Sequence, residues 1–425
     1  ETYQALSVAD AKFPDVTLST GDTVTMTYGQ YRAVVATNRN QADRRAAFLG
    51  HYGTYAATLN TYAALYHGVC ERDWFHARSR GYRTTLDAAL HGNNIPRAVV
   101  DTLIAATRSG VDPLRRYHRV RRRALKLDRY YPYDFSIPLV DWDRRYTYDA
   151  VLDAVVEAAA PLGEAYQARM REGFAGRWID VYENDGKRSG AYSAPVYGAH
   201  PYMLLNYNDT LDAVFTLAHE MGHSMHTLLA HESQPFVYAG YTIFVAEVPS
   251  TLNEDLLLDF MLERAGSREE RMMLLQHAID GIVGTFYNQV LFADYELEAH
   301  RMVERDEPIT ADALSALYSR TLEAYWGDAL SPDDRTAWTW ARIPHFYGSP
   351  FYVYQYATCM ASTAALMQFV GSRDPERRAA GVERYLSLLR AGGSDHPMTL
   401  LKHAGVDLAE PLAIRALVAR FRLEQ

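Results

Sequence analysis

Apolar side chains recur at intervals of three and four residues along most of the chain, which is the spacing of amphipathic helices. Between Gln41 and about Arg78 this pattern predicts one long helix or a helix pair, because it is carried by Phe48, Tyr52, Tyr55, Leu59, Tyr62 and Leu65. Further helices are expected after Pro96, from about Tyr146, and over residues 210–230, 244–264, 268–304 and 310–326, the last capped by Thr310. The pattern therefore predicts a mainly α protein.

Two short regions depart from the helical pattern. Residues 14–28 alternate around the turn Thr20-Gly21-Asp22, which predicts a hairpin. Residues 178–208 are rich in turn residues and include the strand-like run from Tyr202 to Tyr207, so we expect a small sheet inserted among the helices. Since there is neither an internal repeat nor a Gly/Ser/Pro-rich linker, we expect one intertwined body.

Composition excludes few functions but changes the balance between them. The 425 residues carry a formal net charge of −9, which gives no general attraction to nucleic acid or to an anionic membrane. The basic run Arg115–Arg123 could bind nucleic acid, but we expect a solvated helix face or pairs with acidic neighbours. No nucleic-acid or membrane partner is therefore expected.

The cysteine content and the first residues of the chain bear on the cellular compartment of the protein. Cys70 and Cys359 are too few for a disulfide framework, which favours the cytoplasm. The chain starts at Glu1 without the pattern of a secretory signal, but also without an initiator methionine, so a segment upstream is possible. The uncharged stretch between His345 and Arg373 contains many polar residues, and we expect a buried helix there instead of a membrane span.

One segment carries metal chemistry. His219 and His223 are four residues apart in a predicted helix, so both imidazoles project from one face and can bind the same ion. Glu220 borders that face without having to be a ligand, which suits a general base that takes a proton from a zinc-bound water. The alternative is that these are ordinary helix histidines.

A third ligand would decide between those alternatives. His226 lies on the same face, but three ligands stacked along one helix fit tetrahedral zinc poorly. Glu247 lies 24 residues after His223, far enough for the chain to turn and return as an antiparallel helix. We therefore predict His219, His223 and Glu247 as ligands of one zinc ion, with the fourth position open. Glu254 and Asp255 are candidates for hydrogen bonds to the histidines.

Three motifs together resemble the thimet oligopeptidase and oligopeptidase F family of zinc metallopeptidases, and most closely the oligopeptidase F branch. They are His-Glu-Met-Gly-His-Ser-Met-His at 219–226, Glu-Val-Pro-Ser-Thr-Leu-Asn-Glu at 247–254, and Arg-Ile-Pro-His-Phe-Tyr-Gly-Ser-Pro-Phe-Tyr-Val-Tyr-Gln-Tyr-Ala at 342–357. The resemblance extends over nearly the whole chain. It implies a large helical peptidase body with a deep substrate channel and a small β-sheet insertion near the zinc-binding helix.

The resemblance also assigns roles by position. His219, His223 and Glu247 match the zinc ligands and Glu220 the base, while His345, Tyr352 and Tyr354 match groups that bind the substrate carbonyl and the oxyanion. The Gly190-Ala191-Tyr192 turn and the 199–206 strand resemble the family's edge strand, to which a peptide adds by main-chain hydrogen bonds. Members of this branch carry a further helical region before the point where this chain starts.

These inferences predict a zinc oligoendopeptidase that hydrolyses internal bonds of short oligopeptides. Residues 1–140 would form an N-terminal helical part with a hairpin, and residues 141–425 the zinc-binding catalytic part. A carboxypeptidase- or dipeptidase-like activity on the same scaffold is one alternative, for which Lys187 or Arg188 would have to meet a free carboxylate. A non-catalytic zinc-containing peptide-binding protein is another. The oligomeric state is not predicted.

Overall fold

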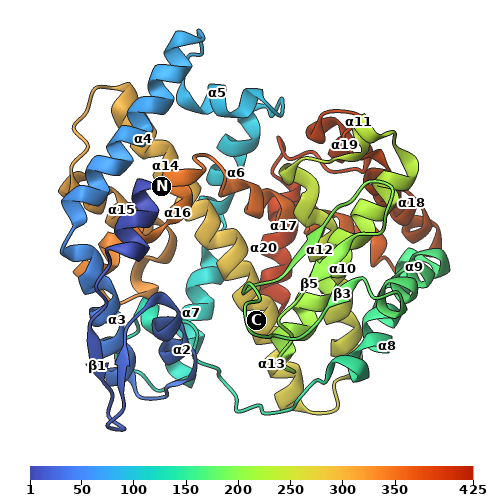
Figure 1. The fold of residues 1–425 in the computed structure, drawn as a ribbon, viewed down its shortest axis with the longest axis horizontal. Helices are drawn as coiled ribbons and strands as arrows, with labels where there is room; N and C mark the ends of the chain where they lie inside the picture. Colours follow the sequence, from blue (N-terminus) through green and yellow to red (C-terminus); the bar gives the residue numbers. More distant parts are fainter. Residues whose placement is uncertain (425) are drawn as a thin grey trace. The chain divides into compact units, whose positions relative to one another are not determined.

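A computed structural model describes residues 1–424, which fold into two compact units that each use several stretches of chain. Unit 1 comprises residues 1–92, 104–139 and 287–354, and unit 2 comprises residues 93–103, 140–286 and 355–425. Both units consist mainly of helices, as the apolar pattern predicted (Figure 1). Helix α6 (Arg97–Ser109) runs from one unit into the other.

Unit 1 combines the predicted hairpin with a set of helices. Strands β1 (Asp15–Thr17) and β2 (Thr23–Thr25) pair antiparallel, with Val16 opposite Val24. The helices are α1 (Thr2–Gln4), α2 (Tyr28–Thr37), α3 (Gln41–Ala56), α4 (Leu59–Ser79), α5 (Thr85–His91), α7 (Asp112–Ala124), α14 (Asn288–Glu304), α15 (Ala311–Trp326) and α16 (Pro344–Gly348). The first predicted helical block is therefore the pair α3 and α4, and the Thr310 side chain caps α15 by accepting a hydrogen bond from Ala313 N.

The basic run lies on α7, and its arginines are engaged within unit 1. Arg121 is buried and donates to the hydroxyls of Tyr130 and Tyr117 at 3.0 and 3.1 Å. Arg119 forms an ion pair with Asp328, and Arg115 donates to main-chain carbonyls at the end of α15. The expected pairing with an acidic neighbour is confirmed for Arg119. Arg121 departs from the expected solvated face, because it is buried against tyrosine hydroxyls, and Arg115 binds main-chain carbonyls instead of an acidic side chain.

Unit 2 places a three-stranded sheet beside a long helix. The sheet order is β3 (Ile179–Asp180), β5 (Tyr202–Leu204) and β4 (Tyr192–Ala194), with β5 parallel to β3 and antiparallel to β4. The helices are α8 (Tyr148–Ala158), α9 (Glu164–Ala175), α10 (Leu211–Ser233), α11 (Phe236–Ala239), α12 (Ile243–Arg264), α13 (Arg268–Ile282), α17 (Tyr354–Val370), α18 (Pro375–Ala391), α19 (Pro397–His403) and α20 (Leu412–Glu424).

Two expectations about secondary structure need correction. The single helix predicted over 268–304 is interrupted by a π-helical turn at Val283–Tyr287, between α13 and α14. The strand predicted over 199–206 is limited to β5, and it is the central strand of its sheet and not an edge. β5 is central because it finds pairing partners on both sides, which a local sequence pattern does not reveal.

The uncharged stretch after His345 contains the whole of α17, whose side chains are largely buried within the protein. Over the residues that the structure describes, no helix combines the length and apolarity that a bilayer crossing requires. The expected buried helix is therefore present.

Candidate metal centre

Helix α10 presents both motif histidines on one face. It begins after Thr210, whose side chain accepts a hydrogen bond from Ala213 N, and its apolar face is buried against the rest of unit 2. One helical turn separates His219 from His223, and their Nε2 atoms lie 3.1 Å apart. A pair of lone-pair donors this close requires a shared proton or a shared cation between them.

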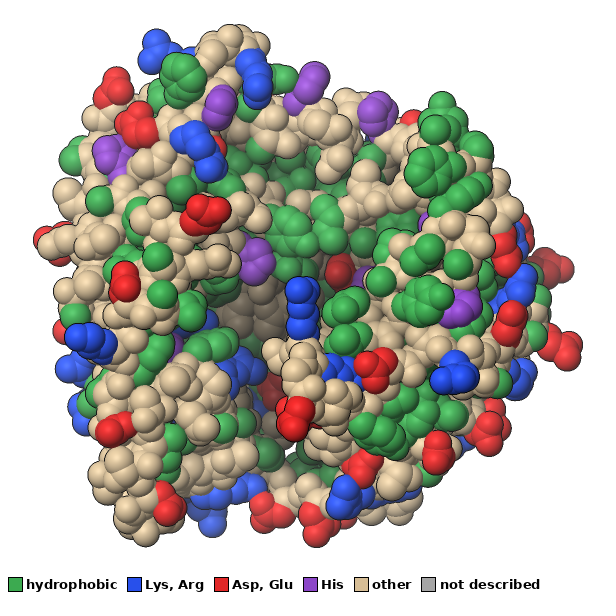
Figure 2. Space-filling model, viewed as in Figure 1, with side chains coloured by type: hydrophobic (Ala, Val, Ile, Leu, Met, Phe, Trp, Pro, Cys, Tyr) green, Lys and Arg blue, Asp and Glu red, His purple; other side chains and the backbone are tan. Residues whose placement is uncertain are grey.

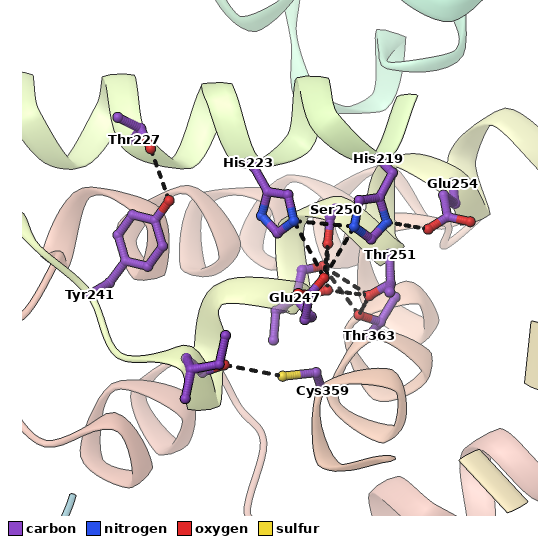
Figure 3. A network of polar contacts seen from close by, with 12 residues as sticks. His219, His223, Thr227, Tyr241, Glu247, Ser250, Thr251, Glu254, Cys359 and Thr363 are labelled. Carbon is purple, nitrogen blue, oxygen red and sulfur yellow. Dashed lines mark hydrogen bonds and ion pairs between the residues drawn. The ribbon is translucent and has the colours of Figure 1, made fainter. Parts of the chain in front are cut away.

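Glu247 completes a triangle of donor atoms from the neighbouring helix α12. Its Oε2 atom lies 3.2 Å from His219 Nε2 and 3.4 Å from His223 Nε2 (Figure 3). Two ligands bound at 2.0–2.1 Å to a tetrahedral ion are separated by about 3.3 Å, so the triangle has the size that zinc needs. The structure thus brings together the three residues predicted as ligands, and the donor set fits a divalent cation.

The Glu247 carboxylate is held in place by its own helix. Ser250 Oγ lies 2.9 Å from Glu247 Oε2 and donates to it. Pro249 lies inside α12 and has no N–H to donate, whereas Thr251 Oγ1 donates to the main-chain carbonyl of Glu247 at 2.6 Å. Thr251 Oγ1 also lies 2.6 Å from Thr363 Oγ1 on α17, which ties this part of α12 to a third helix.

Glu254 orients the first histidine. Its Oε1 atom lies 2.6 Å from His219 Nδ1, so the Nδ1–H can donate to the carboxylate and leave Nε2 free for a metal. Burial disfavours the charged imidazolium, but the bonds to Glu247 and Glu254 still raise the pKa of His219 well above its usual value. The site therefore strongly favours positive charge. The other candidate, Asp255, forms an ion pair with Arg420.

Replacing Glu254 by alanine is expected to weaken zinc binding by about 10- to 100-fold, because the His219 ring loses the partner that fixes its orientation and tautomer. Zinc affinity is measured by competition with a chromophoric chelator. Glu263→Ala is the matched control, since Glu263 lies on the same helix with a side chain that is 79% exposed. Equal affinities for the two variants would contradict the role of Glu254.

Glu220 borders the donor triangle and is buried. Its Oε2 atom has no hydrogen-bond partner among the described residues, and burial raises the pKa of its carboxyl group. A buried carboxylate oxygen without a partner is costly unless water or a ligand reaches it. Glu220, His219, His223 and Glu247 all line one groove, so a water or a substrate in that groove can supply the partner.

The groove has a volume of about 860 Å³ and lies within unit 2. Tyr192 and Ser193 of β4 form part of its wall, and β4 is one of the two edge strands of the sheet. Of the two segments predicted to form a peptide-binding edge, the strand that follows Gly190 lies at an edge of the sheet and the 199–206 segment provides the central strand. Peptide binding at β4 stays a prediction. Lys187, considered above as a partner of a free carboxylate, is engaged by Asp180 at 3.1 Å.

Two features of the site have no clear signal in the sequence. His226 is buried, and its ring stacks on Tyr241 with ring centroids 3.6 Å apart, so it is packed beside the groove and not directed at the donor triangle. At Gly222 the helices α10 and α12 approach closely, because a Cβ atom there would lie 2.5 Å from Pro249 O and 2.6 Å from Ser250 Cα. Both features depend on how the helices pack.

The residues predicted to bind the oxyanion lie in unit 1. His345 is on α16, and its ring stacks on Tyr352 with centroids 5.6 Å apart. Between His345 and Tyr352, Phe351 adopts φ +57°, a left-handed backbone conformation that is rare for a bulky residue. Their role toward the donor triangle of unit 2 stays a prediction.

Buried polar groups hold this turn. Phe351 N donates to Glu296 Oε1 at 2.9 Å, and the Phe351 ring packs on His300, which pairs with Asp73 at 3.2 Å. Burial, with the nearby Asp73 charge, raises the pKa of Glu296 to about 7, although His300 and the Phe351 N–H oppose the shift. A carboxyl group with a raised pKa binds its proton more tightly in the folded state than in the unfolded state.

The folded protein should therefore lose stability as pH rises from about 4.5 to 7, because in this range the unfolded state releases the Glu296 proton while the folded state retains it. Glu296→Gln is expected to reduce this loss by an amount on the order of 2 kcal/mol. Urea unfolding at several pH values measures the effect, with Glu298→Gln on the same helix, a partly exposed ion-pair residue, as control. Identical pH slopes in wild type and Glu296→Gln would contradict the assignment.

Comparison with known proteins accounts for the whole chain. The family model described as peptidase family M3 matches residues 34–418. Oligopeptidase PepF of Bacillus subtilis is 38% identical over 421 residues, which are 99% of this chain and 62% of that protein. Group B oligopeptidase PepB of Streptococcus agalactiae is 38% identical over 96% of this chain and 67% of its own length. The chain thus spans only 62% to 67% of the length of these relatives.

Solved structures give the same result. The crystal structure of a Chlamydophila abortus protein described as a putative peptidase superposes with a TM-score of 0.92 and 34% identity, over 100% of this chain and 71% of that one. Oligoendopeptidase-F from Enterococcus faecium superposes with a TM-score of 0.81 and 30% identity, over 100% of this chain and 69% of that one. The resemblance stated from the three motifs is confirmed. This chain belongs to peptidase family M3.

Proposed function

We propose that this chain hydrolyses internal peptide bonds of short oligopeptides at one zinc ion held by His219, His223 and Glu247. The observation that carries the proposal is the triangle of Nε2, Nε2 and Oε2 atoms, with sides of 3.1 to 3.4 Å, beside the unpartnered carboxylate oxygen of Glu220. A structural zinc site has no use for a buried base at its open side. The family membership and the names of the relatives support the same function.

When bound, zinc would supply a Lewis acid that polarises the scissile carbonyl and acidifies water. Glu220 takes the proton from the attacking water and delivers it to the leaving amine, so one carboxylate serves first as base and then as acid. Its burial suits this role, because burial raises the pKa of the carboxyl group toward neutral pH. The free edge of β4 can receive the peptide main chain, which would align the bond with the donor triangle.

His345, Tyr352 and Tyr354 are proposed to donate hydrogen bonds to the substrate carbonyl and to the oxyanion that forms from it. The support is the match of the 342–357 motif to the family, together with the buried network that fixes the turn between His345 and Tyr354. Donors aimed at developing charge are worth about 100- to 1,000-fold in rate.

Cleavage of a mixed library of short peptides, read by mass spectrometry, tests the proposal. Defined internal cuts are expected from the zinc-loaded protein, their loss after chelation, and their return when one equivalent of zinc is added. Cuts that release only C-terminal residues would favour the carboxypeptidase alternative. Cuts that persist after complete removal of metal would overturn the proposal.

A further inference from the structure

Large apolar side chains lie exposed at one end of the metal-centre groove. Phe236 is 72% exposed, Val237 76% and Tyr197 43%, and all three line the groove that contains His219 and Glu220. Hydrophobic atoms gather over α11 in the space-filling view (Figure 2). Exposed apolar side chains that adjoin a polar reaction site are typical of a surface that binds an apolar part of a ligand. Tyr197, Phe236 and Val237 are called the apolar end below.

The backbone of α11, which carries Phe236 and Val237, packs against the chain that follows α18. Gly393 N donates to Tyr238 O at 2.8 Å, and Gln234 Nε2 donates to Arg390 O at 3.0 Å on the same side. A Cβ atom on Gly392, whose φ is +52°, would lie 2.4 Å from Tyr238 O, so the chain after α18 packs directly against the backbone of α11. The Tyr197 ring contacts Phe236 edge to face, at a centroid distance of 5.3 Å. These contacts anchor the backbone of α11, and the ring contact joins Tyr197 to Phe236.

The direction of the groove follows from two contacts with α10. Ser193 Oγ of β4 lies 2.9 Å from Ser224 Oγ, next to the ligand His223. Further along the chain, Tyr197 OH donates to Gln234 O at 3.1 Å, at the end of α10. The segment from β4 to Tyr197 therefore runs in the same direction as α10, away from the donor triangle. A peptide that pairs antiparallel with β4, as β5 does, would place its N-terminal residues at the apolar end.

The distance between the donor triangle and the apolar end indicates which residue of a bound peptide would reach the apolar end. The Tyr197 ring packs on His231, which lies eight residues beyond His223 on α10. At 1.5 Å per helical residue this is about 12 Å. An extended peptide advances about 3.3 Å per residue, so the apolar end is reached about four residues from the bond at the metal centre.

We propose that Tyr197, Phe236 and Val237 form a subsite for a large apolar side chain located about four residues N-terminal to the cleaved bond. The inference rests on the proposed function and deepens it, because it names a class of substrate: peptides with Phe, Leu or Tyr at that distance before the scissile bond. Shorter N-terminal arms would leave the subsite empty and react more slowly.

A library of randomised ten-residue peptides tests the preference. Mass spectrometry is used to compare residues around the cuts made by wild type, by Phe236→Ser/Val237→Ser and by Leu412→Ser, a control on α20 whose side chain is 71% exposed away from this groove. Enrichment of apolar residues about four positions before the cut is expected for wild type and the control, and its loss for the double variant. Unchanged enrichment in the double variant, or enrichment only after the cut, would overturn the proposal.

A binding measurement tests the proposed subsite independently of peptide cleavage. Fluorescently labelled peptides with Phe or Ser at the chosen position are titrated into zinc-loaded Glu220→Gln protein, with and without the double substitution. A preference for the Phe peptide of about tenfold or more is expected, and its loss in the double variant, because the buried ring no longer meets apolar partners. If the protein prefers the Phe peptide but the wild type cleaves no peptide, the proposed peptidase function is wrong and the proposed subsite stands. Equal binding of both peptides would overturn the proposal of a subsite. The proposal would also be overturned if another polypeptide segment covers Tyr197, Phe236 and Val237.

Discussion

Replacing Glu220 by glutamine is expected to lower kcat for peptide cleavage by about 100- to 10,000-fold, the usual contribution of a positioned general base. Glutamine has nearly the same shape but cannot accept the proton of the attacking water. Because Glu220 is not a corner of the donor triangle, the variant should bind zinc as tightly as wild type and change KM little. Initial rates of cleavage of a defined peptide measure kcat and KM, and a zinc titration measures the zinc affinity.

Glu232→Gln is the matched control for this substitution. Glu232 lies on the same helix, but it is exposed and pairs with Arg169 at 2.5 Å, outside the groove. The control should retain wild-type kcat. A Glu220→Gln variant that cleaves at more than a tenth of the wild-type rate would show that another group acts as the base.

Replacing Gly222 by alanine is expected to disrupt the metal centre although Gly222 offers no ligand atom. The added Cβ would meet Pro249 O at 2.5 Å and Ser250 Cα at 2.6 Å, and both belong to main chain that cannot rotate away. Helices α10 and α12 must then separate, which moves Glu247 away from His219 and His223. Overpacking of this kind typically costs about 1–3 kcal/mol of stability. We expect zinc affinity to fall at least about tenfold, because ligand distances must stay close to their ideal values.

Gly281→Ala provides the comparison, since no atom lies within 4 Å of a Cβ built at Gly281 on α13. This variant should keep wild-type zinc affinity and gain slightly in stability, because alanine favours a helix over glycine by about 1 kcal/mol. Zinc titration and thermal unfolding of both variants measure the difference. If Gly222→Ala binds zinc as wild type does, the close approach of the two helices is not what sets the ligand distances.

The sequence predicted the features that depend on local periodicity. The spacing of His219 and His223 places both rings on one face wherever the helix forms, and Thr310 starts its helix through a local side-chain hydrogen bond. Glu247 could be chosen because the intervening chain is long enough to turn back. The structure brings its carboxylate to within 3.4 Å of both histidines.

Features that depend on packing between distant segments were not predictable. Asp255 pairs with Arg420, which lies 165 residues later, so no local pattern could distinguish it from Glu254 as the partner of His219. The central place of β5 depends on finding strands on both sides of it. The requirement for glycine at position 222 arises only where α12 crosses α10. Long-range contacts also create the apolar end, because Tyr197 and Phe236 meet only in the folded chain.

Helices α10 and α12 are proposed to hold one metal ion between them, and the metal content of the purified protein measures this directly. Wild type, Glu220→Gln and His223→Ala are loaded with zinc, dialysed against buffer with trace zinc, and analysed by mass spectrometry of the metal. We predict one zinc per chain in wild type and Glu220→Gln, and far less than one in His223→Ala, which lacks one corner of the donor triangle. Full zinc occupancy in His223→Ala, or no zinc in wild type, would contradict the account.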